Sequence, residues 1–319
     1  MTHDRSNNSG DHSTEYRRER RASVVHINGQ KPKENIRMCV FDVSDRIEFH
    51  EGQLIQDMFQ FNEEDLETMP RVAADVFAIK YDHWPIDNSD LSLVLVDEYL
   101  KKNREHFLKG EHVDRLVDEE RLPSVDAILS YIEEHYDAIS ISGSDDSTMN
   151  DNLPYLKILL PLIRKCVTKR DFPVFGICFG AQAIIRALKG DNAVSTMKKQ
   201  GKDHEYGFLK YKMLQPNVLF EGVSDNFIST AYHGDCFLLE EEEKLVTSDY
   251  WDNQAFQIKD RRCFGVQFHP EFPKAFSVQM FEDLAKVNKE AYIVKDAPSP
   301  DLEPGRCIAR NYIRAILQK

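Results

Sequence analysis

A single strand-to-helix turn in the middle of the chain constrains its fold more than any other feature. Residues 173–177 (Pro-Val-Phe-Gly-Ile) form an apolar run typical of a buried strand, and residues 181–188 have the composition of a helix. The turn between them contains Gly176-x-Cys178-x-Gly180, where a β-carbon at either glycine would crowd the backbone. This pattern predicts a nucleophile elbow, a strained turn that lifts one side chain, here Cys178, above a sheet.

The predicted position of Cys178 favours the thiolate form of its side chain. A helix that begins directly after the cysteine presents its N-terminal N–H groups and the positive end of its dipole to the sulfur. We therefore expect the pKa of Cys178 to lie below the value of about 8.5 for a free thiol. The turn alone leaves an alternative open, because a core cysteine after a buried strand has the same local pattern.

A second segment contains the groups that a cysteine nucleophile needs. Residues 263–268 read as another buried strand, and His269-Pro270-Glu271 follows directly. A nucleophile of this kind requires a base to accept its proton and a carboxylate to orient that base. A lone histidine at a strand end is more often structural, but the two segments together are far more specific. Cys178, His269 and Glu271 are therefore the predicted catalytic residues.

Strands and helices alternate along the chain. We predict strands at residues 36–43, 76–81, 138–142 and 173–177, and helices at residues 153–168 and 181–188. This alternation indicates βαβ units, and therefore a doubly wound α/β fold with a mostly parallel sheet covered on both faces. Residues 205–257 predict a small antiparallel extension, and residues 274–319 contain two helical segments around a proline-rich loop at 296–305. Ligands of such sheets bind at the carboxyl ends of the strands, where Cys178 and His269 fall.

The chain is predicted to contain one folded domain. Residues 1–35 are polar and lack periodicity, so we expect a disordered tail there. Residues 36–319 are assigned to the α/β domain. Within it, the segment 87–122 is charged and has helical spacing. Three roles for it remain open: a lid over the active site, a partner surface, or an inert pair of surface helices.

The net charge, the apolar runs and the cysteine spacing of the chain argue against several classes of partner and site. The formal net charge of −13 at pH 7 argues against binding to nucleic acid or to an anionic membrane. No apolar run reaches the roughly 18 residues of a membrane span, and the N-terminus lacks the apolar core of a signal peptide. The six cysteines show no C-x-x-C spacing and no metal pattern. We therefore expect a cytoplasmic protein without a metal or other cofactor.

Several segments resemble the class I, triad-type glutamine amidotransferases. Residues 176–182 (G-I-C-F-G-A-Q) and 265–272 (G-V-Q-F-H-P-E-F) resemble the nucleophile and His-Glu motifs of that family. Residues 230–237 (T-A-Y-H-G-D-C-F) are similar to a segment of its GMP synthase-like members. Residues 136–147 resemble the strand and loop that supply part of the oxyanion hole. The resemblance implies a flavodoxin-like amidotransferase domain. It also implies that segment 87–122 is an insertion, because this connection is shorter in a minimal domain of the family.

The resemblance also implies roles for individual residues. The backbone N–H groups of Phe179 and of Gly143 or Ser144 are expected to form the oxyanion hole. Gln182 and Asp235 are expected to bind the substrate, with Asp235 accepting hydrogen bonds from its amino group.

The loop after residue 142 departs from the family pattern. Many members have a proline or a second glycine there, whereas this chain has Gly143-Ser144-Asp145-Asp146. We expect the two aspartates to be solvated loop charges rather than catalytic groups.

Three functions fit these residues. The first is hydrolysis of the side-chain amide of glutamine or of a γ-glutamyl compound through a γ-glutamyl thioester, as the glutaminase part of an amidotransferase. The sequence has no convincing synthase domain, so a separate synthase subunit would use the ammonia. The second is a stand-alone γ-glutamyl peptidase or hydrolase. The third is a non-enzymatic scaffold, and the presence of Cys178, His269 and Glu271 counts against it.

Overall fold

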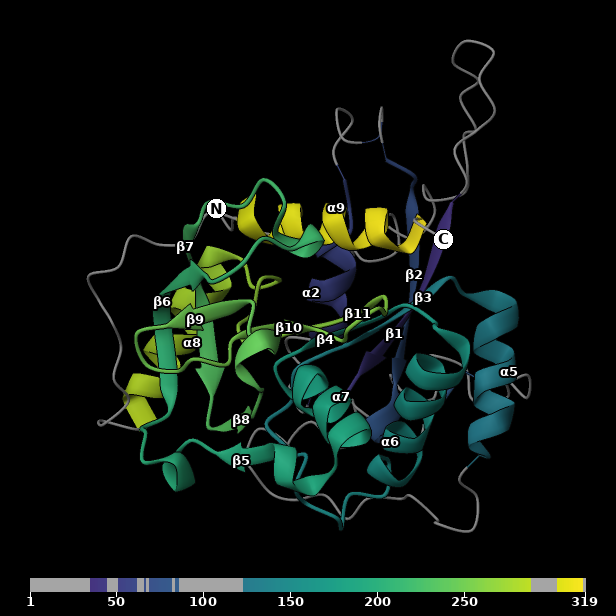
Figure 1. Ribbon diagram of the computed structural model, residues 1–319, viewed down its shortest axis with the longest axis horizontal. Coiled ribbons are helices and arrows are strands. Elements are labelled where there is room, and N and C mark those ends of the chain that lie inside the picture. Colours follow the sequence, from purple (N-terminus) through teal and green to yellow (C-terminus); the bar gives the residue numbers. More distant parts are fainter. Residues whose placement is uncertain are drawn as a thin grey trace, which may run out of the picture. The chain divides into compact units, whose positions relative to one another are not determined.

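The structure is a computed structural model that describes residues 35–44, 51–61, 66, 69–81, 84–85, 123–287 and 303–317 (Figure 1). The predicted insertion at residues 87–122 and residues 1–34 of the predicted tail lie outside these ranges. What we expect of those two segments therefore stays a prediction.

The described residues form one large mixed sheet and one small sheet. The large sheet has nine strands in the order β2-β1-β3-β4-β11-β10-β9-β6-β7. Its parallel strands are β2 (Val72–Ala78), β1 (Ile36–Asp42), β3 (Ala138–Ile141), β4 (Val174–Ile177) and β11 (Cys263–Val266). Its antiparallel strands are β10 (Ala255–Gln257), β9 (Val246–Ser248), β6 (Glu205–Met213) and β7 (Asn226–His233). The small sheet pairs β5 (Val194–Thr196) with β8 (Asp235–Phe237). The predicted α/β sheet with an antiparallel extension is confirmed.

Helices cover both faces of the parallel strands, as a doubly wound fold requires. One face packs against α5 (Val125–His135), α6 (Leu156–Lys165) and α7 (Phe179–Lys189). The opposite face packs against α2 (Glu51–Met58) and α9 (Glu303–Leu317), as Figure 1 shows. Helix α8 (Lys274–Val287) contributes to a smaller aromatic cluster beside β6.

Strand β1 shows why a continuous apolar run forms a central strand. Successive side chains of a strand point to opposite faces of the sheet. Met38 and Val40 pack on the side of α2 and α9, whereas Cys39 and Phe41 pack on the side of α5, α6 and α7. All four are fully buried. A strand covered on both faces needs apolar residues at every position, which is the pattern that the sequence shows.

The second strand lies earlier than predicted. β2 spans Val72–Ala78 and pairs with β1 along its whole length, whereas we predicted a strand at residues 76–81. Residues 79–81 instead form the 3-10 helix η1 (Ile79–Tyr81), which buries Lys80. Residues 73–75 (Ala-Ala-Asp) have weak strand propensity, and pairing with β1 overrides that preference.

Helix α9 begins inside the loop that we predicted at residues 296–305. Proline is tolerated in the first turn of a helix because the N–H groups there have no helical acceptor, so Pro304 does not prevent the helix. A β-carbon at Gly305 would lie 2.2 Å from the carbonyl oxygen of Pro270. The start of α9 therefore lies directly against the turn that carries His269 and Glu271.

The remaining helical segments are short. Helix α6 ends at Lys165 and continues as the π-helical turn η3 (Cys166–Arg170), where we predicted one helix over residues 153–168. The 3-10 turns are η4 (Asp191–Ala193), η5 (Lys198–Gln200), η6 (Val218–Phe220) and η7 (Glu241–Glu243). In the part of the chain that the structure describes, no helix is long and apolar enough to cross a membrane.

Candidate active site

Cys178 lies in the turn between β4 and α7. Its backbone has φ 51° and ψ −107°, a conformation that residues with a side chain seldom adopt. Both neighbouring glycines are sterically required. A β-carbon at Gly176 would lie 2.5 Å from the carbonyl carbon of Gly180, and one at Gly180 would lie 2.4 Å from the carbonyl oxygen of Ile141. The predicted strained turn is present, and strain of this kind concentrates at functional sites.

Hydrogen bonds join this turn to the neighbouring strands. The N–H of Cys178 donates to the carbonyl of Val266 on β11 (2.8 Å), and the N–H of Gly180 donates to the carbonyl of Ser142 after β3 (3.1 Å). The Cys178 sulfur lies 3.8 Å from the carbonyl oxygen of Tyr232 on β7. The carboxyl ends of β3, β4 and β11 therefore meet at Cys178, at the edge where α/β sheets bind ligands.

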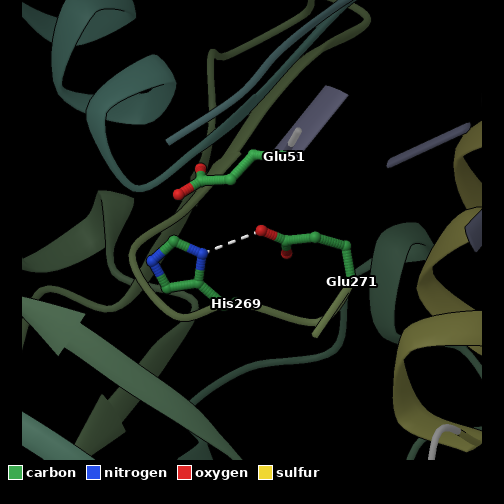
Figure 2. Close-up of side chains that lie close together, drawn as sticks. All are labelled: Glu51, His269 and Glu271. Atoms are coloured by element: carbon green, nitrogen blue, oxygen red, sulfur yellow. Dashed lines mark hydrogen bonds and ion pairs between the residues drawn. The ribbon is translucent and has the colours of Figure 1, made fainter. Parts of the chain in front are cut away.

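His269 and Glu271 form a buried pair directly after β11. Nδ1 of His269 lies 2.8 Å from Oε1 of Glu271 (Figure 2), and both side chains are almost fully buried. The imidazole stacks on Phe272 with ring centroids 4.1 Å apart, and the N–H of His269 donates to the carbonyl of Thr230 (2.8 Å). A carboxylate at Nδ1 favours the tautomer that carries its proton there, which leaves Nε2 as the basic nitrogen.

Cys178 and His269 influence each other's protonation. Burial raises the pKa of the Cys178 thiol, and His269 lowers it again only in part. Burial acts to lower the pKa of His269, but Glu271 and Cys178 together raise it well above its usual value. The expected low pKa of Cys178 is therefore wrong for the resting site. Burial has the largest effect on the pKa of this thiol, so a thiolate forms here as the partner of the His269 imidazolium.

The predicted oxyanion residues lie around the same strand ends. Gly143 and Ser144 follow β3, and Phe179 is the first residue of α7. Among the described residues, no acceptor is found for the backbone N–H of any of these three. Gly143 allows a close approach, because a β-carbon there would lie 2.8 Å from Cε1 of His269. Their role as oxyanion donors stays a prediction.

The loop after β3 is held by a buried ion pair. Nζ of Lys80, which is 2% exposed, lies 2.8 Å from Oδ2 of Asp146, and the hydroxyl of Tyr155 donates to the same oxygen (2.8 Å). The hydroxyl of Ser144 accepts from the N–H of Asp146 (3.1 Å) and donates to the carbonyl of Val43 (2.7 Å). The expectation that Asp146 is a solvated loop charge is therefore wrong, because its carboxylate forms an ion pair with a buried lysine.

The two predicted substrate-binding residues contact each other. The side-chain amide of Gln182 donates to the backbone carbonyl of Asp235 (3.0 Å) and to Oε1 of Gln267 (3.3 Å). Gln182 is buried, whereas Asp235 is partly exposed. Gln182 therefore holds the start of β8, from which the Asp235 carboxylate projects. That either residue binds substrate stays a prediction.

A second buried hydrogen-bond network supports the turn between β7 and β8. Glu205 on β6 accepts hydrogen bonds from Ser248 (2.7 Å) and Gln254 (2.7 Å), and it lies 2.7 Å from Nε2 of His233. Nδ1 of His233 lies 3.0 Å from the carbonyl of Asp235. Burial acts to raise the pKa of Glu205, but its hydrogen bonds, above all that with His233, lower it overall. Because protein groups engage both ring nitrogens of His233, this ring positions Asp235.

A buried carboxyl group that we did not single out from the sequence also lies in the site. Glu51, the first residue of α2, is 7% exposed, and its Oε2 has no hydrogen-bond partner among the described residues. A β-carbon at Gly143 would lie 2.4 Å from this oxygen. Figure 2 shows the Glu51 carboxyl pointing toward the imidazole of His269. Burial raises the pKa of Glu51 to about 8, so the group is mainly protonated at neutral pH.

Glu51 lacks a local sequence signal. An acidic residue at the start of a helix is common, because it interacts favourably with the helix dipole. The strand order supplies the missing information. Because β1 lies beside β3, the helix that follows β1 begins next to Gly143. In a flavodoxin-like sheet this boundary is the topological switch point, where ligands bind.

Comparison with known proteins agrees with this architecture. The model of the family described as glutamine amidotransferase class-I matches residues 94–284, more than half of the chain. The chain is similar to a subunit of a glutamine-hydrolysing GMP synthase from Methanosphaera stadtmanae, with 32% identity over 110 residues. It is also similar to the corresponding GMP synthase subunit from Methanococcus maripaludis, with 34% identity over 140 residues.

These alignments are partial. They cover 34% of this chain and 56% of the first relative, and 42% of this chain and 63% of the second. The chain therefore matches less than two thirds of the length of either relative.

Solved structures show the same fold across most of the chain. A glutamine amidotransferase from Thermotoga maritima superimposes with a TM-score of 0.53 and 17% identity, covering 89% of this chain and 99% of the other. A glutamine amidotransferase from Methylobacillus flagellatus gives a TM-score of 0.51 and 16% identity, with 88% and 94% covered. With the match of the family model, these observations establish that the chain belongs to the class I glutamine amidotransferase family.

Proposed function

We propose that this chain hydrolyses the side-chain amide of glutamine, or of a γ-glutamyl compound, through a γ-glutamyl thioester on Cys178. The observation that carries this proposal is the position of Cys178 on a strained turn beside the buried pair of His269 and Glu271. Membership of the class I family supports the choice of a glutamine amide. The chain would act as the glutaminase part of an amidotransferase.

Acylation begins with transfer of the Cys178 proton to Nε2 of His269. The thiolate attacks the amide carbonyl, so that a carbon–sulfur bond forms. Collapse of the tetrahedral intermediate breaks the carbon–nitrogen bond, and His269 returns the proton to the departing ammonia. Glu271 accepts the Nδ1–H hydrogen bond and stabilises the transient imidazolium. This pairing is consistent with the raised pKa of His269.

Deacylation uses the same residues. His269 removes a proton from a water molecule, which attacks the thioester carbonyl, and the proton then returns to the sulfur of Cys178. In both steps a negative charge develops on the carbonyl oxygen. The backbone N–H groups of Phe179 and of Gly143 or Ser144 would stabilise that charge from about 3 Å.

Binding of the substrate's amino acid end is assigned to Gln182 and Asp235. The Asp235 carboxylate would accept hydrogen bonds from the α-amino group, and the contact from Gln182 would keep it in place. A charge-assisted hydrogen bond of this kind contributes about 1.5–3 kcal/mol.

A separate synthase subunit would receive the ammonia. The two relatives above are named as subunits of glutamine-hydrolysing GMP synthases, and by this likeness we propose a partner subunit that carries the acceptor site. The reaction would take place in the cytoplasm without nucleic acid or membrane as a partner. A stand-alone γ-glutamyl peptidase or hydrolase with the same three residues is the alternative.

The test is release of ammonia or amine by the purified chain from glutamine, γ-glutamyl amides and γ-glutamyl peptides, with Cys178→Ala as the control. Hydrolysis of glutamine that Cys178→Ala abolishes would support the glutaminase, and faster turnover of γ-glutamyl peptides would support the alternative. A chloroketone analogue of glutamine, which should alkylate Cys178, tests the site even if turnover requires a partner subunit. Absence of both turnover and labelling at Cys178 would contradict both functions.

A further inference from the structure

Three buried side chains beside the proposed nucleophile direct potential metal ligands toward one another. One ligand atom each from Glu51, His269 and Glu271 lies within 4.8 Å of the other two. They come from the start of α2 and from the turn after β11, and Figure 2 shows them converging. All three are more than nine-tenths buried.

The polar atoms of this cluster are incompletely satisfied by the protein. Oε2 of Glu51 and Oε2 of Glu271 are buried without a hydrogen-bond partner in the described part of the chain. Nδ1 is the nitrogen of His269 that lies beside this cluster, 2.8 Å from Oε1 of Glu271. The Glu51 side chain makes no hydrogen bond with the described residues. Buried carboxylate oxygens are normally paired, because an unpaired one has lost its hydration without replacement.

We propose that Glu51, His269 and Glu271 form a binding site for a divalent transition metal of the zinc type, and that occupation of this site switches the proposed reaction off. Nothing in the mechanism requires Glu51, and the sequence shows no metal-binding motif around it. The binding site stands on the cluster itself, whereas the inhibition rests on the proposed function.

The donor set fits zinc better than the hard cations. One imidazole nitrogen and two carboxylate oxygens are common zinc ligands, at about 2.0–2.2 Å from the metal, with a water molecule in the fourth position. Tetrahedral ligands at these distances lie about 3.4 Å apart. The ligand atoms lie within 4.8 Å of one another, and Nδ1 of His269 lies 2.8 Å from Oε1 of Glu271, so Glu51 has to approach the pair while the pair separates slightly. Magnesium and calcium prefer six or more oxygen ligands, and several of these would have to be waters. A buried site with one nitrogen ligand does not suit them.

Metal binding would inactivate the site by occupying its base. A zinc ion bound to the three side chains displaces the proton between His269 and Glu271 and the proton of the Glu51 carboxyl, and both protons are released to solvent. His269 then cannot accept the proton of Cys178, and Glu271 no longer stabilises an imidazolium. Glu51 supplies the third ligand, so it should determine how strongly the metal binds.

A competing arrangement uses the sulfur instead of Glu51. Thiolates are strong zinc ligands, and Cys178 interacts with His269. A zinc ion held by Cys178 and His269 would also inhibit, but it would leave Glu51 without a role. If Glu51 is a ligand, its removal should weaken zinc binding and removal of Cys178 should not. If the sulfur is a ligand, the reverse should hold.

Zinc binding to the full chain separates these arrangements. Four proteins are titrated with zinc chloride against a chromophoric chelator: the unmodified chain, Glu51→Gln, Cys178→Ala, and Glu221→Gln, which changes an exposed glutamate. Any weaker zinc site elsewhere on the chain should be the same in all four proteins, so the comparison reports on the tight site. Loss of a carboxylate ligand should weaken the tight site about tenfold or more, so Glu51→Gln should lose it while Cys178→Ala and Glu221→Gln keep it. Circular dichroism confirms that each variant is folded.

The ligands and the metal's effect are measured separately. Zinc X-ray absorption should show nitrogen and oxygen ligands near 2.0 Å, and no sulfur near 2.3 Å. Zinc should slow alkylation of Cys178 in the unmodified chain but not in Glu51→Gln, whereas magnesium should have no effect on either. Tight binding that survives in Glu51→Gln, or that disappears in Cys178→Ala with a sulfur ligand in the spectrum, would overturn the proposal. Tight binding without slower alkylation would retain the site and reject the switch.

Discussion

Lys80 and Asp146 form an ion pair, with Nζ 2.8 Å from Oδ2, beneath the loop that carries Gly143 and Ser144. Lys80 belongs to the turn after β2, and Asp146 follows β3, so the pair joins the segments that leave two different strands. The chain shows no local sign of this contact, because the two residues are far apart in sequence.

Lys80→Met should therefore impair both stability and activity. Breaking a buried ion pair by removing one partner typically costs about 3–5 kcal/mol. Because Asp146 is 15% exposed and also accepts a hydrogen bond from Tyr155, we expect the lower end of this range. Denaturant unfolding and glutamine turnover measure the two effects. The double variant Lys80→Met with Asp146→Leu should recover stability but not activity. If Lys80→Met had neither effect, the pair would not be supporting the loop.

Glu51 should make the protein less stable as the pH rises. Burial raises its pKa in the folded chain to about 8, so between the usual value for a free glutamate and pH 8 the folded state binds more protons than the unfolded state. The contribution of the protonated Glu51 carboxyl to the free energy of unfolding is complete at low pH and is lost as the pH rises toward 8. At about 1.4 kcal/mol per unit of pKa, the loss has an upper limit of about 5 kcal/mol.

Glu51→Gln removes this dependence. The variant should be more stable than the unmodified chain at pH 8 and differ little from it at pH 5. Urea unfolding at both pH values, in the presence of a chelator, measures the difference. Equal stability of the two proteins at pH 8 would mean that Glu51 is solvated in solution.

The elbow glycines should tolerate no side chain. Gly180→Ala would place a β-carbon 2.4 Å from the carbonyl oxygen of Ile141, so the turn or β3 must move, and turnover should fall by at least about a hundredfold because a shift near 1 Å has this effect. Gly201→Ala is the control for steric contact, because nothing lies within 4 Å of a β-carbon there. Its positive φ of 71° adds a backbone strain that Gly180 does not have, so the comparison is a strict one. Comparable activities of the two variants would argue against the elbow geometry.

Asp235→Asn should weaken substrate binding and leave the nucleophile intact. Loss of a charge-assisted hydrogen bond predicts that KM for glutamine rises about tenfold or more, while the rate of Cys178 alkylation by iodoacetamide stays nearly constant. Steady-state kinetics and alkylation kinetics on the same preparation provide both numbers. An unchanged KM for glutamine and for γ-glutamyl peptides would remove Asp235 from the site.

Local patterns predicted the parts of the structure that depend on near neighbours in sequence. The elbow at Cys178 and the apolar strands β1, β4 and β11 each fit within one short segment, because the turn and the buried strand impose their residue types locally. The sequence also proposed His269 and Glu271 together, because they lie two positions apart.

Features that depend on tertiary placement were missed or misjudged. Glu51 and Lys80 reach the site because β1, β2 and β3 are adjacent, and neither carries a motif. The helix dipole and His269 led us to expect a low pKa for Cys178, but burial, which the sequence does not reveal, raises that pKa. β2 was placed too late, because its pairing with β1 outweighs the weak strand propensity of its alanines.

The central claim is that Cys178 forms the covalent intermediate. The most direct measurement is acid quenching of the chain during turnover of glutamine, followed by mass spectrometry of its peptides. The account predicts a γ-glutamyl group on the peptide that contains Cys178. The adduct should be absent in Cys178→Ala and should form on no other cysteine. Burial raises the pKa of Cys39 and Cys263 as it does that of Cys178, but no histidine acts on those two thiols to accept the proton. Turnover that persists in Cys178→Ala, or an adduct on a different residue, would contradict the account.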